Sequence, residues 1–283
     1  MISDVINLMR CAMAIHFSIR RRLCLCLAFL MLMSLSTISS ADDSTNSVMW
    51  DYTRKLFLGD AAYQFDDRIR VELPIFAEDS MQVPLLVDAS ALGQEVVQII
   101  AWADYNPIQH IFTYHPEPGI VPLVALPFKV QQSTPVRAAV QLASGEWRVG
   151  TGFVDAAGGG CTLPSMTRME DDWLSRLGDI SAGRFERPSL HTQEPTQEPT
   201  QASIERYRFR VMHPMDSGLV ANIPSFYLEQ LELRGDENEV LIRMSLSPAV
   251  SENPLITFDS HLSGGAYTLW LRDNDGNEFR QVF

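Results

Sequence analysis

The segment VRAAVQLASGEWRVGTGF (residues 136–153) indicates the fold of this chain more directly than any other stretch. Mostly apolar residues occupy every second position on both sides of a Ser144-Gly145 turn. They are Val136, Ala138, Val140 and Leu142 before the turn, and Trp147, Val149, Thr151 and Phe153 after it. A period of two residues is typical of a half-buried strand, so the segment predicts a β-hairpin.

The same pattern extends outward through residues 68–154, where short apolar or alternating runs are separated by turn-forming segments. The runs lie at 69–73, 83–87, 96–101 and 111–114, and the turns at 104–107 and 115–119. Many short strands at this spacing predict a β-sandwich. Ahead of them, residues 47–57 predict a short amphipathic helix whose apolar face is formed by Val48, Tyr52 and Leu56 at four-residue spacing, ended by Gly59.

A second strand-rich unit begins at Ile204, with alternating runs at 207–211, 240–246 and 267–271 and a strong turn signal at 273–277. Between the two units, the tetrapeptide Gln-Glu-Pro-Thr occurs twice, at 193–196 and 197–200. Such a tract has no core of its own and is typical of an extended, solvated linker.

The first 41 residues have the layout of a secretory signal. Arg20-Arg21-Arg22 precede an apolar run at 23–35, and Ser39-Ser40-Ala41 follows it. We therefore expect cleavage after Ala41 and export, with an uncleaved anchor as the alternative.

The chain is strongly acidic, with a formal charge of −13. Residues 1–41 hold four arginines and one acid, so the remainder has 18 basic and 34 acidic residues and a charge of −16. That balance excludes the electrostatic footprint of nucleic-acid binding. It likewise predicts no binding to an anionic membrane surface once the signal is removed.

Cysteine usage singles out one residue. Cys11, Cys24 and Cys26 all lie in the signal segment, which leaves Cys161 as the one cysteine of the exported protein. A single thiol cannot form an internal disulfide, so it is buried, paired with another chain, or kept for chemistry.

Gly158, Gly159 and Gly160 immediately precede Cys161. Glycines leave the backbone unhindered, so we expect a flexible arm that projects the thiol rather than a core cysteine. The nearest cation in sequence is Arg168, which gives weak support for an activated catalytic nucleophile. The pattern instead predicts a handle that is delivered to other active sites.

At this point the chain resembles a known family. Gly-Gly-Gly-Cys at the end of a β domain resembles the carrier arm of the SoxY proteins of periplasmic sulfur oxidation. Residues 211–218 and 223–227 are similar to the opening of SoxZ, and Ser251-Glu252-Asn253-Pro254 is similar to a SoxZ Ser-x-Asn-Pro motif. The whole arrangement resembles fused SoxYZ-like carriers of the group associated with quinoprotein dehydrogenases.

The resemblance implies a non-enzymatic carrier that holds a sulfur-containing intermediate on Cys161 and needs no cofactor. It implies partners among periplasmic c-type cytochromes, other sulfur-oxidation enzymes or a quinoprotein dehydrogenase system. One departure matters: the usual SoxY arm ends freely in Gly-Gly-Cys-Gly-Gly, whereas Thr162-Leu163-Pro164 continues this chain and tethers the arm at both ends.

The sequence therefore predicts an all-β protein with two immunoglobulin-like β-sandwich domains joined by a flexible linker. The expected parts are a signal peptide (1–41), a SoxY-like domain (42–161), a linker (162–202) and a SoxZ-like domain (203–283). Two rival functions remain: an interaction module in which Cys161 forms an intermolecular disulfide, and a thiol enzyme using a histidine supplied by the fold.

His213-Pro214-Met215 predicts no metal or haem site, because no second histidine stands at ligand spacing. Asp273, Asp275 and Gly276 predict a β-turn rather than a calcium loop.

Overall fold

The computed structural model describes residues 43–187, 204–262 and 264–283. The expected signal peptide and the two Gln-Glu-Pro-Thr repeats lie outside these residues. These described residues belong to one compact unit. No helix in the described part of the chain is long and apolar enough to span a bilayer.

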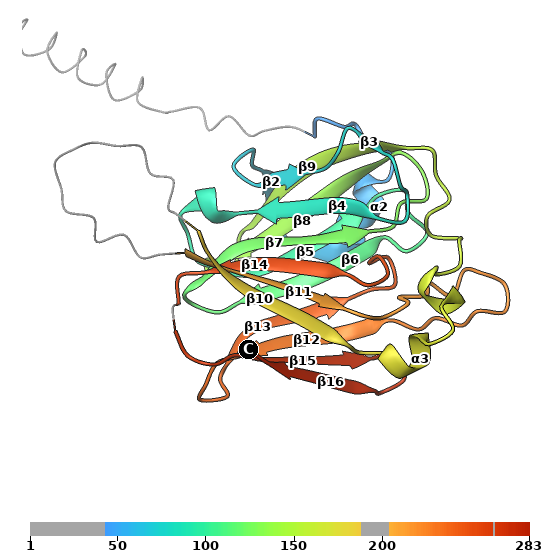
Figure 1. Cartoon of the computed structure of the whole chain (residues 1–283). Helices are drawn as coiled ribbons and strands as arrows, with labels where there is room; N and C mark the ends of the chain where they lie inside the picture. The colour runs from blue at the N-terminus through green and yellow to red at the C-terminus, as the bar shows by residue number, and fades with distance from the viewer. Residues whose placement is uncertain (1–42, 188–203, 263) are drawn as a thin grey trace, which may run out of the picture. The chain divides into compact units, whose positions relative to one another are not determined.

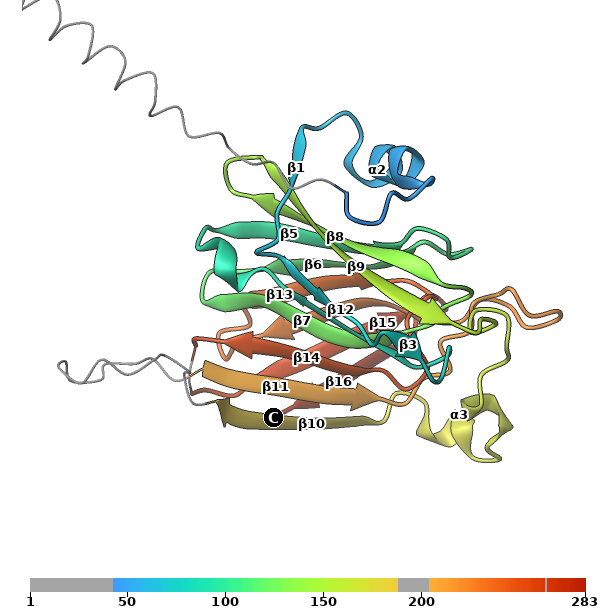
Figure 2. The same ribbon diagram turned by 90° about the horizontal axis from the view of Figure 1, so that it is seen from above.

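The unit consists of two β-sheets packed face to face (Figures 1 and 2). The first sheet contains β1 (Tyr63–Phe65), β9 (Trp147–Ala156), β8 (Thr134–Leu142), β5 (Val96–Ala103), β6 (His110–Pro116), β13 (Val240–Leu246), β12 (Leu228–Arg234), β15 (Thr268–Asp273) and β16 (Glu278–Val282), with β3 (Phe76–Ala77) paired to β9. The second contains β10 (Ile180–Arg187), β11 (Ile204–Val211), β14 (Leu255–Ser260), β7 (Ile120–Phe128), β4 (Val83–Asp88) and β2 (Arg70–Glu72). The helices are α2 (Trp50–Leu58) and α3 (Trp173–Arg176), with 3-10 turns at Ser90–Leu92 and Thr167–Met169. The predicted all-β class and the short N-terminal helix are confirmed.

The N-terminal and C-terminal halves contribute strands to both sheets. β6 pairs antiparallel with β13, which places Tyr114 opposite Met244. β7 pairs antiparallel with β14, which places Val124 opposite Phe258. The two strand-rich domains are therefore joined edge to edge through backbone hydrogen bonds in each layer, in addition to the covalent connection between them.

The predicted hairpin at 136–153 is confirmed as β8 and β9, paired from Thr134↔Val154 to Gln141↔Trp147. Gly145 has a φ of +88° in the connecting turn, a conformation that favours glycine. Successive side chains of β8 point to opposite faces of the sheet and pack in two separate apolar clusters. Val140 packs between the sheets, whereas Ala139 packs on the outer face beneath α2.

The apolar face predicted for the N-terminal helix is wrong. Val48, just before α2, is 88% exposed, and Tyr52 and Leu56 are also exposed. The helix instead buries Trp50, Thr53 and Leu58. The physical reason is that α2 covers a polar group on the sheet, so the buried side of the helix includes a threonine.

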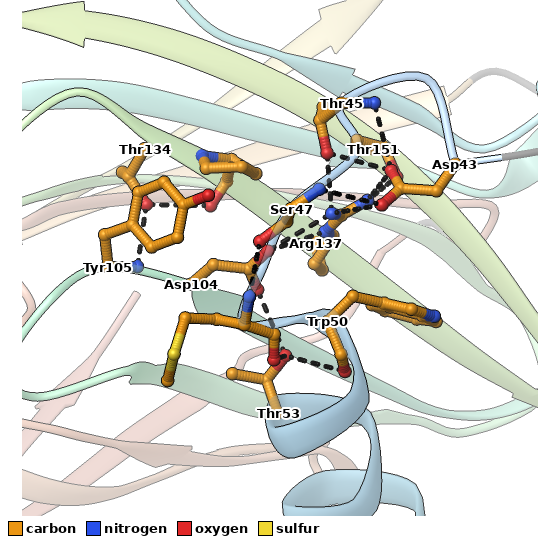
Figure 3. Close-up of polar contacts among 12 residues, drawn as sticks. Asp43, Thr45, Ser47, Trp50, Thr53, Asp104, Tyr105, Thr134, Arg137 and Thr151 are labelled. Carbon is orange, nitrogen blue, oxygen red and sulfur yellow. Dashed lines mark hydrogen bonds and ion pairs between the residues drawn. The ribbon is translucent and has the colours of Figure 1, made fainter.

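That polar group is centred on Arg137, which is completely buried on β8 (Figure 3). Its guanidinium lies 2.6 Å from an Asp43 carboxylate oxygen and 3.1 Å from an Asp104 oxygen. The Trp50 ring covers the same guanidinium at 4.9 Å, and the Thr53 hydroxyl donates a 3.2 Å hydrogen bond to Asp104. Ion pairing with Arg137 helps to hold the pKa of Asp43 at about 2, against the opposing effect of burial. These contacts fix residues 43–58 to the first sheet.

Part of the segment expected to be a linker has regular structure. β10 pairs with β11 along its whole length, from Ile180↔Val211 to Arg187↔Ile204. A 3-10 turn and α3 lie between Cys161 and β10. The chain between Cys161 and the first strand that follows it is therefore shorter than the whole 162–202 segment.

Candidate functional site

The glycine run after β9 lies against the chain that follows β7. The Gly159 N–H donates to the carbonyl of Gln131 at 3.1 Å, and the Gly160 N–H donates to the carbonyl of Val130 at 3.0 Å. These contacts give the arm a defined position in this conformation, which we call the seat of the arm (residues 129–131 and the loop 213–217 described below).

The glycines are required by the geometry of the seat. A β-carbon on Gly160 would lie 2.0 Å from the Ser80 carbonyl oxygen, and one on Gly158 would lie 2.6 Å from the Gln131 carbonyl oxygen. Gly159 has open space around it but a φ of +92°. Side chains at 158 and 160 would therefore prevent the arm from approaching the neighbouring backbone.

Cys161 is buried in this arrangement, with a residue exposure of 1%. Its S–H donates weakly to the Lys129 carbonyl at 3.6 Å, and its backbone N–H donates to Oε1 of Gln131 at 3.2 Å. Burial raises the pKa of the thiol to about 11, although the Lys129 charge acts in the opposite direction. The thiol is therefore protonated and weakly nucleophilic while the arm is seated.

The expectation that the thiol projects freely is not met in this conformation. The lack of side chains that makes a glycine run flexible also lets its N–H groups reach neighbouring carbonyls. The arm consequently folds back onto residues 129–131, and the cysteine that follows it is buried. Whether Gly158, Gly159 and Gly160 act as a swinging segment stays a prediction.

The C-terminal half completes the seat through residues 213–217. The Ser217 hydroxyl donates a 2.7 Å hydrogen bond to the Cys161 carbonyl. The Lys129 ammonium donates to the carbonyl of Met215, a residue with a positive φ of 50°. Arg168, seven residues beyond the cysteine, forms an ion pair with Asp216. The cysteine is thus held between the two halves of the chain.

His213 supports this loop. Its Nδ1 accepts the Met215 N–H at 3.1 Å, while Nε2 lies 3.7 Å from Asp273, too far for a hydrogen bond. Burial lowers the pKa of the ring below its ordinary value. In the described residues no histidine hydrogen-bonds the thiol, and no group of His, Cys, Asp and Glu side chains could hold a metal ion.

The Asp273 turn also has a structural explanation. The N–H groups of Asp275 and Asn277 donate to an Asp273 oxygen at 3.0 and 2.8 Å. Gly276 has a φ of +90°, as expected for the predicted turn. These bonds occupy Asp273, the carboxylate that also faces His213.

Sequence reasoning missed Lys129, Gln131 and Ser217. Lys129 did carry a signal, because it is one of only two lysines in the chain, while arginine supplies the other 20 basic residues. Gln131 and Ser217 carried none, since both are common polar residues whose roles depend on the meeting of distant segments.

Two family models match separate parts of the chain. The family model described as sulfur oxidation protein SoxY matches residues 54–161, and the model described as sulphur oxidation protein SoxZ matches residues 194–283. No curated protein matches the chain.

Two solved structures show partial likeness. The sulfur carrier protein SoxY from Chlorobium limicola f thiosulfatophilum is 20% identical with a TM-score of 0.34, over 38% of this chain and 90% of that one. SGBP-B from the Bacteroides ovatus mixed-linkage glucan utilization locus, solved with a mixed-linkage heptasaccharide, is 10% identical with a TM-score of 0.15. That overlap covers 67% of this chain and 62% of the other.

The assignment depends on the two family models, because both structural similarities are weak. The SoxY match ends at Cys161 itself, and the SoxZ match includes Ser217 and the rest of the loop that covers it. The chain therefore belongs to the SoxYZ carrier proteins of sulfur oxidation, with a SoxY domain and a SoxZ domain fused in one polypeptide.

Proposed function

We propose that this SoxYZ protein carries a sulfur-containing intermediate covalently on Sγ of Cys161 and presents it to partner enzymes in the periplasm. The observation that supports this proposal is the seat, which holds one thiol at the junction of both domains through a few backbone contacts. A core cysteine would be surrounded by packed side chains instead. Here Cys161 follows a glycine run bound mainly through its own N–H groups.

The contacts that hold the arm are weak enough to exchange for contacts with a partner. Five hydrogen bonds hold residues 159–161 in the seat: two from glycine N–H groups, one from the Cys161 N–H, a weak one from the Cys161 S–H and one from the Ser217 hydroxyl. A typical hydrogen bond contributes about 0.5–1.5 kcal/mol net. Release of the arm therefore costs a few kcal/mol, which an interface with a partner can supply.

Release also changes the reactivity of the thiol. In the seat, burial holds the thiol pKa at about 11. In water this penalty disappears, so the pKa falls toward its ordinary value and the thiolate fraction at neutral pH rises. The seated form protects the thiol, and the released form is the reactive one.

The reach of the arm is limited by its two attachments. Cys161 lies five positions beyond Ala156, the end of β9. At about 3.3–3.6 Å per extended residue, Cys161 can move up to roughly 16–18 Å from that point. On the other side of Cys161, the Arg168–Asp216 ion pair is the second attachment, seven residues further along the chain.

Loading the cargo through a new sulfur–sulfur bond defines what the partners must supply. Forming a sulfur–sulfur bond between the Cys161 thiol and a second thiol-type sulfur removes two electrons and two protons. The loading partner must accept those electrons, which suits a periplasmic c-type cytochrome or a quinoprotein dehydrogenase system. Unloading then requires a hydrolytic partner or a further oxidising one. The carrier itself supplies only the thiol, consistent with a protein that is not an enzyme.

The signal-like sequence of residues 1–41 is the basis for proposing export and a periplasmic location. Intact-mass analysis of the protein from its native periplasm tests both the location and the cargo. We expect a mass without residues 1–41, plus sulfur-containing adducts that disappear in the Cys161→Ser variant. A quantitative Cys161–Cys161 dimer without adducts would support an interaction module and reject the carrier. Turnover by the isolated protein would reject the non-enzymatic role.

A further inference from the structure

Lys129 is a buried cation that pairs with no carboxylate among residues 43–187, 204–262 and 264–283. It lies directly after β7, and only 5% of the residue is exposed. Its ammonium donates to the Met215 carbonyl, and no carboxylate forms an ion pair with it among the residues that the structure describes. A buried charge of this kind is expensive unless another charge compensates it.

Two carboxylates, Asp216 and Glu252, act electrostatically on the Lys129 ammonium, but each already has another partner. Asp216 pairs with Arg168. Glu252 accepts hydrogen bonds from the Ser165 hydroxyl and from the Thr167 N–H at 3.0 Å. Both help to raise the pKa of Lys129, yet burial outweighs them and lowers that pKa to about 8.

The third group that acts on Lys129 is Cys161. Its S–H donates to the carbonyl of the same lysine, so the sulfur and the Lys129 backbone are in direct contact. Among the groups around Lys129, this sulfur is the one whose charge changes when the carrier is loaded. A thiol is neutral at neutral pH, whereas a conjugate that ends in a sulfonate carries a full negative charge.

We propose that Lys129 is the counter-ion for an anionic sulfur group bound to Cys161 when the arm is seated. The inference rests on the proposed carrier function, and it specifies that the cargo is anionic. A neutral adduct of similar size gains nothing from the ammonium and leaves the lysine uncompensated. The lysine thus selects the charged, loaded arm over both the bare thiol and neutral adducts.

The seat must adjust slightly to accept the conjugate. The bare thiol is already buried, so the added atoms displace residues next to Cys161 or move the cysteine outward. Lysine suits such an adjustable contact, because its charge is a point at the end of a flexible four-carbon stem. If its hydrogen bond to the Met215 carbonyl breaks, the ammonium can move toward the negative charge of the conjugate.

The presence of only two lysines makes the test direct. The full chain is exported from a host grown with ¹³Cε-labelled lysine, and the pKa of each lysine is measured by NMR. Cys161 is converted in urea either to the S-sulfonate, with sulfite and tetrathionate, or to the neutral methylthio disulfide, and the protein is refolded. Lys55, exposed on α2, is the internal control.

We expect the S-sulfonate to raise the pKa of Lys129 by about one unit or more, as an opposite charge at close range does. The methylthio adduct should not raise it, and Lys55 should not respond to either. No rise with the sulfonate, or an equal rise with both adducts, overturns the proposal.

Variants give a second measurement. Exchange of the Cys161 amide hydrogen, which bonds Gln131 when the arm is seated, reports how often the arm opens. The sulfonated arm should exchange about tenfold more slowly than the methylthio arm, a difference retained in Lys129→Arg and lost in Lys129→Met. If Lys129→Met keeps the difference, the counter-ion role is rejected. Because the adducts are installed chemically, a native protein without adducts would reject the proposed function while leaving this result intact.

Discussion

The Ser217 hydroxyl donates a 2.7 Å hydrogen bond to the Cys161 carbonyl, so a side chain of the SoxZ domain holds the last residue of the SoxY match. This bond joins residues 56 positions apart in the sequence. It makes the SoxZ domain part of the control of the thiol, and it can be removed without changing the arm itself.

Replacing Ser217 with alanine should therefore loosen the arm. Loss of one hydrogen bond of about 0.5–1.5 kcal/mol predicts a roughly two- to tenfold faster alkylation of Cys161 by iodoacetamide. Peptide mass spectrometry identifies the alkylated residue. Ser245→Ala, at an exposed position on β13, is the matched control and should leave the rate unchanged. Equal rates in both variants would contradict a latch at Ser217.

Replacing Gly160 with alanine should expel the arm. The new β-carbon would lie 2.0 Å from the Ser80 carbonyl oxygen, a contact that only movement of backbone can relieve. We expect Cys161 alkylation to rise by more than about tenfold, because the seat loses at least two of its hydrogen bonds. Gly159→Ala meets no atom within 4 Å and is strained only by its positive φ, so its effect should be smaller. The critical result is that Cys161 is alkylated faster in Gly160→Ala than in Gly159→Ala.

Stability should depend on pH through Cys161. The ordinary thiol pKa is 9.0 and the buried one is about 11, so the folded protein favours the protonated thiol. The resulting stabilisation is complete below about pH 9 and is lost as the pH rises to 11. The free energy of unfolding in urea should thus fall in the wild type by about 1–3 kcal/mol relative to Cys161→Ser over this range. Parallel pH curves for the two proteins would show that the thiol is not buried in solution.

The ion pairs of Arg137 should dominate the attachment of the N-terminal segment. Arg137→Met leaves the buried Asp104 carboxylate without its cation, which is expected to cost about 3–5 kcal/mol of unfolding free energy. Arg280→Met removes an exposed pair with Glu278 and should cost at most about 1 kcal/mol. Urea denaturation of both variants measures the comparison. Similar losses would mean that the buried cluster is not a major source of stability.

Local patterns predicted the strands well, because a strand with one or both faces buried has an alternating or continuous run of apolar residues in its own sequence. The hairpin of β8 and β9 is an example, since its turn and alternation lie within residues 136–153. The prediction of the buried helix face was wrong for a reason that lies outside the helix. Thr53 is buried because Asp104, on a distant part of the chain, needs a hydrogen-bond donor.

The candidate thiol was found from the sequence, but its environment was not. A cysteine count and a glycine run identify Cys161 without any structure. Its burial depends on the Ser80 and Val130 carbonyls and on Ser217, which come from three separate regions. The pairing of β6 with β13 is equally invisible locally, because edge partners are chosen by the packing of the whole sheet.

The shared sheets have a consequence for how the protein is made. If the SoxZ half were missing, β6 and β7 would each present unpaired N–H and C=O groups along an open edge, a hazard for aggregation. Fusion delivers both halves from one translation event in a fixed one-to-one stoichiometry. The nascent chain therefore carries with it the strands that cap its own exposed edges.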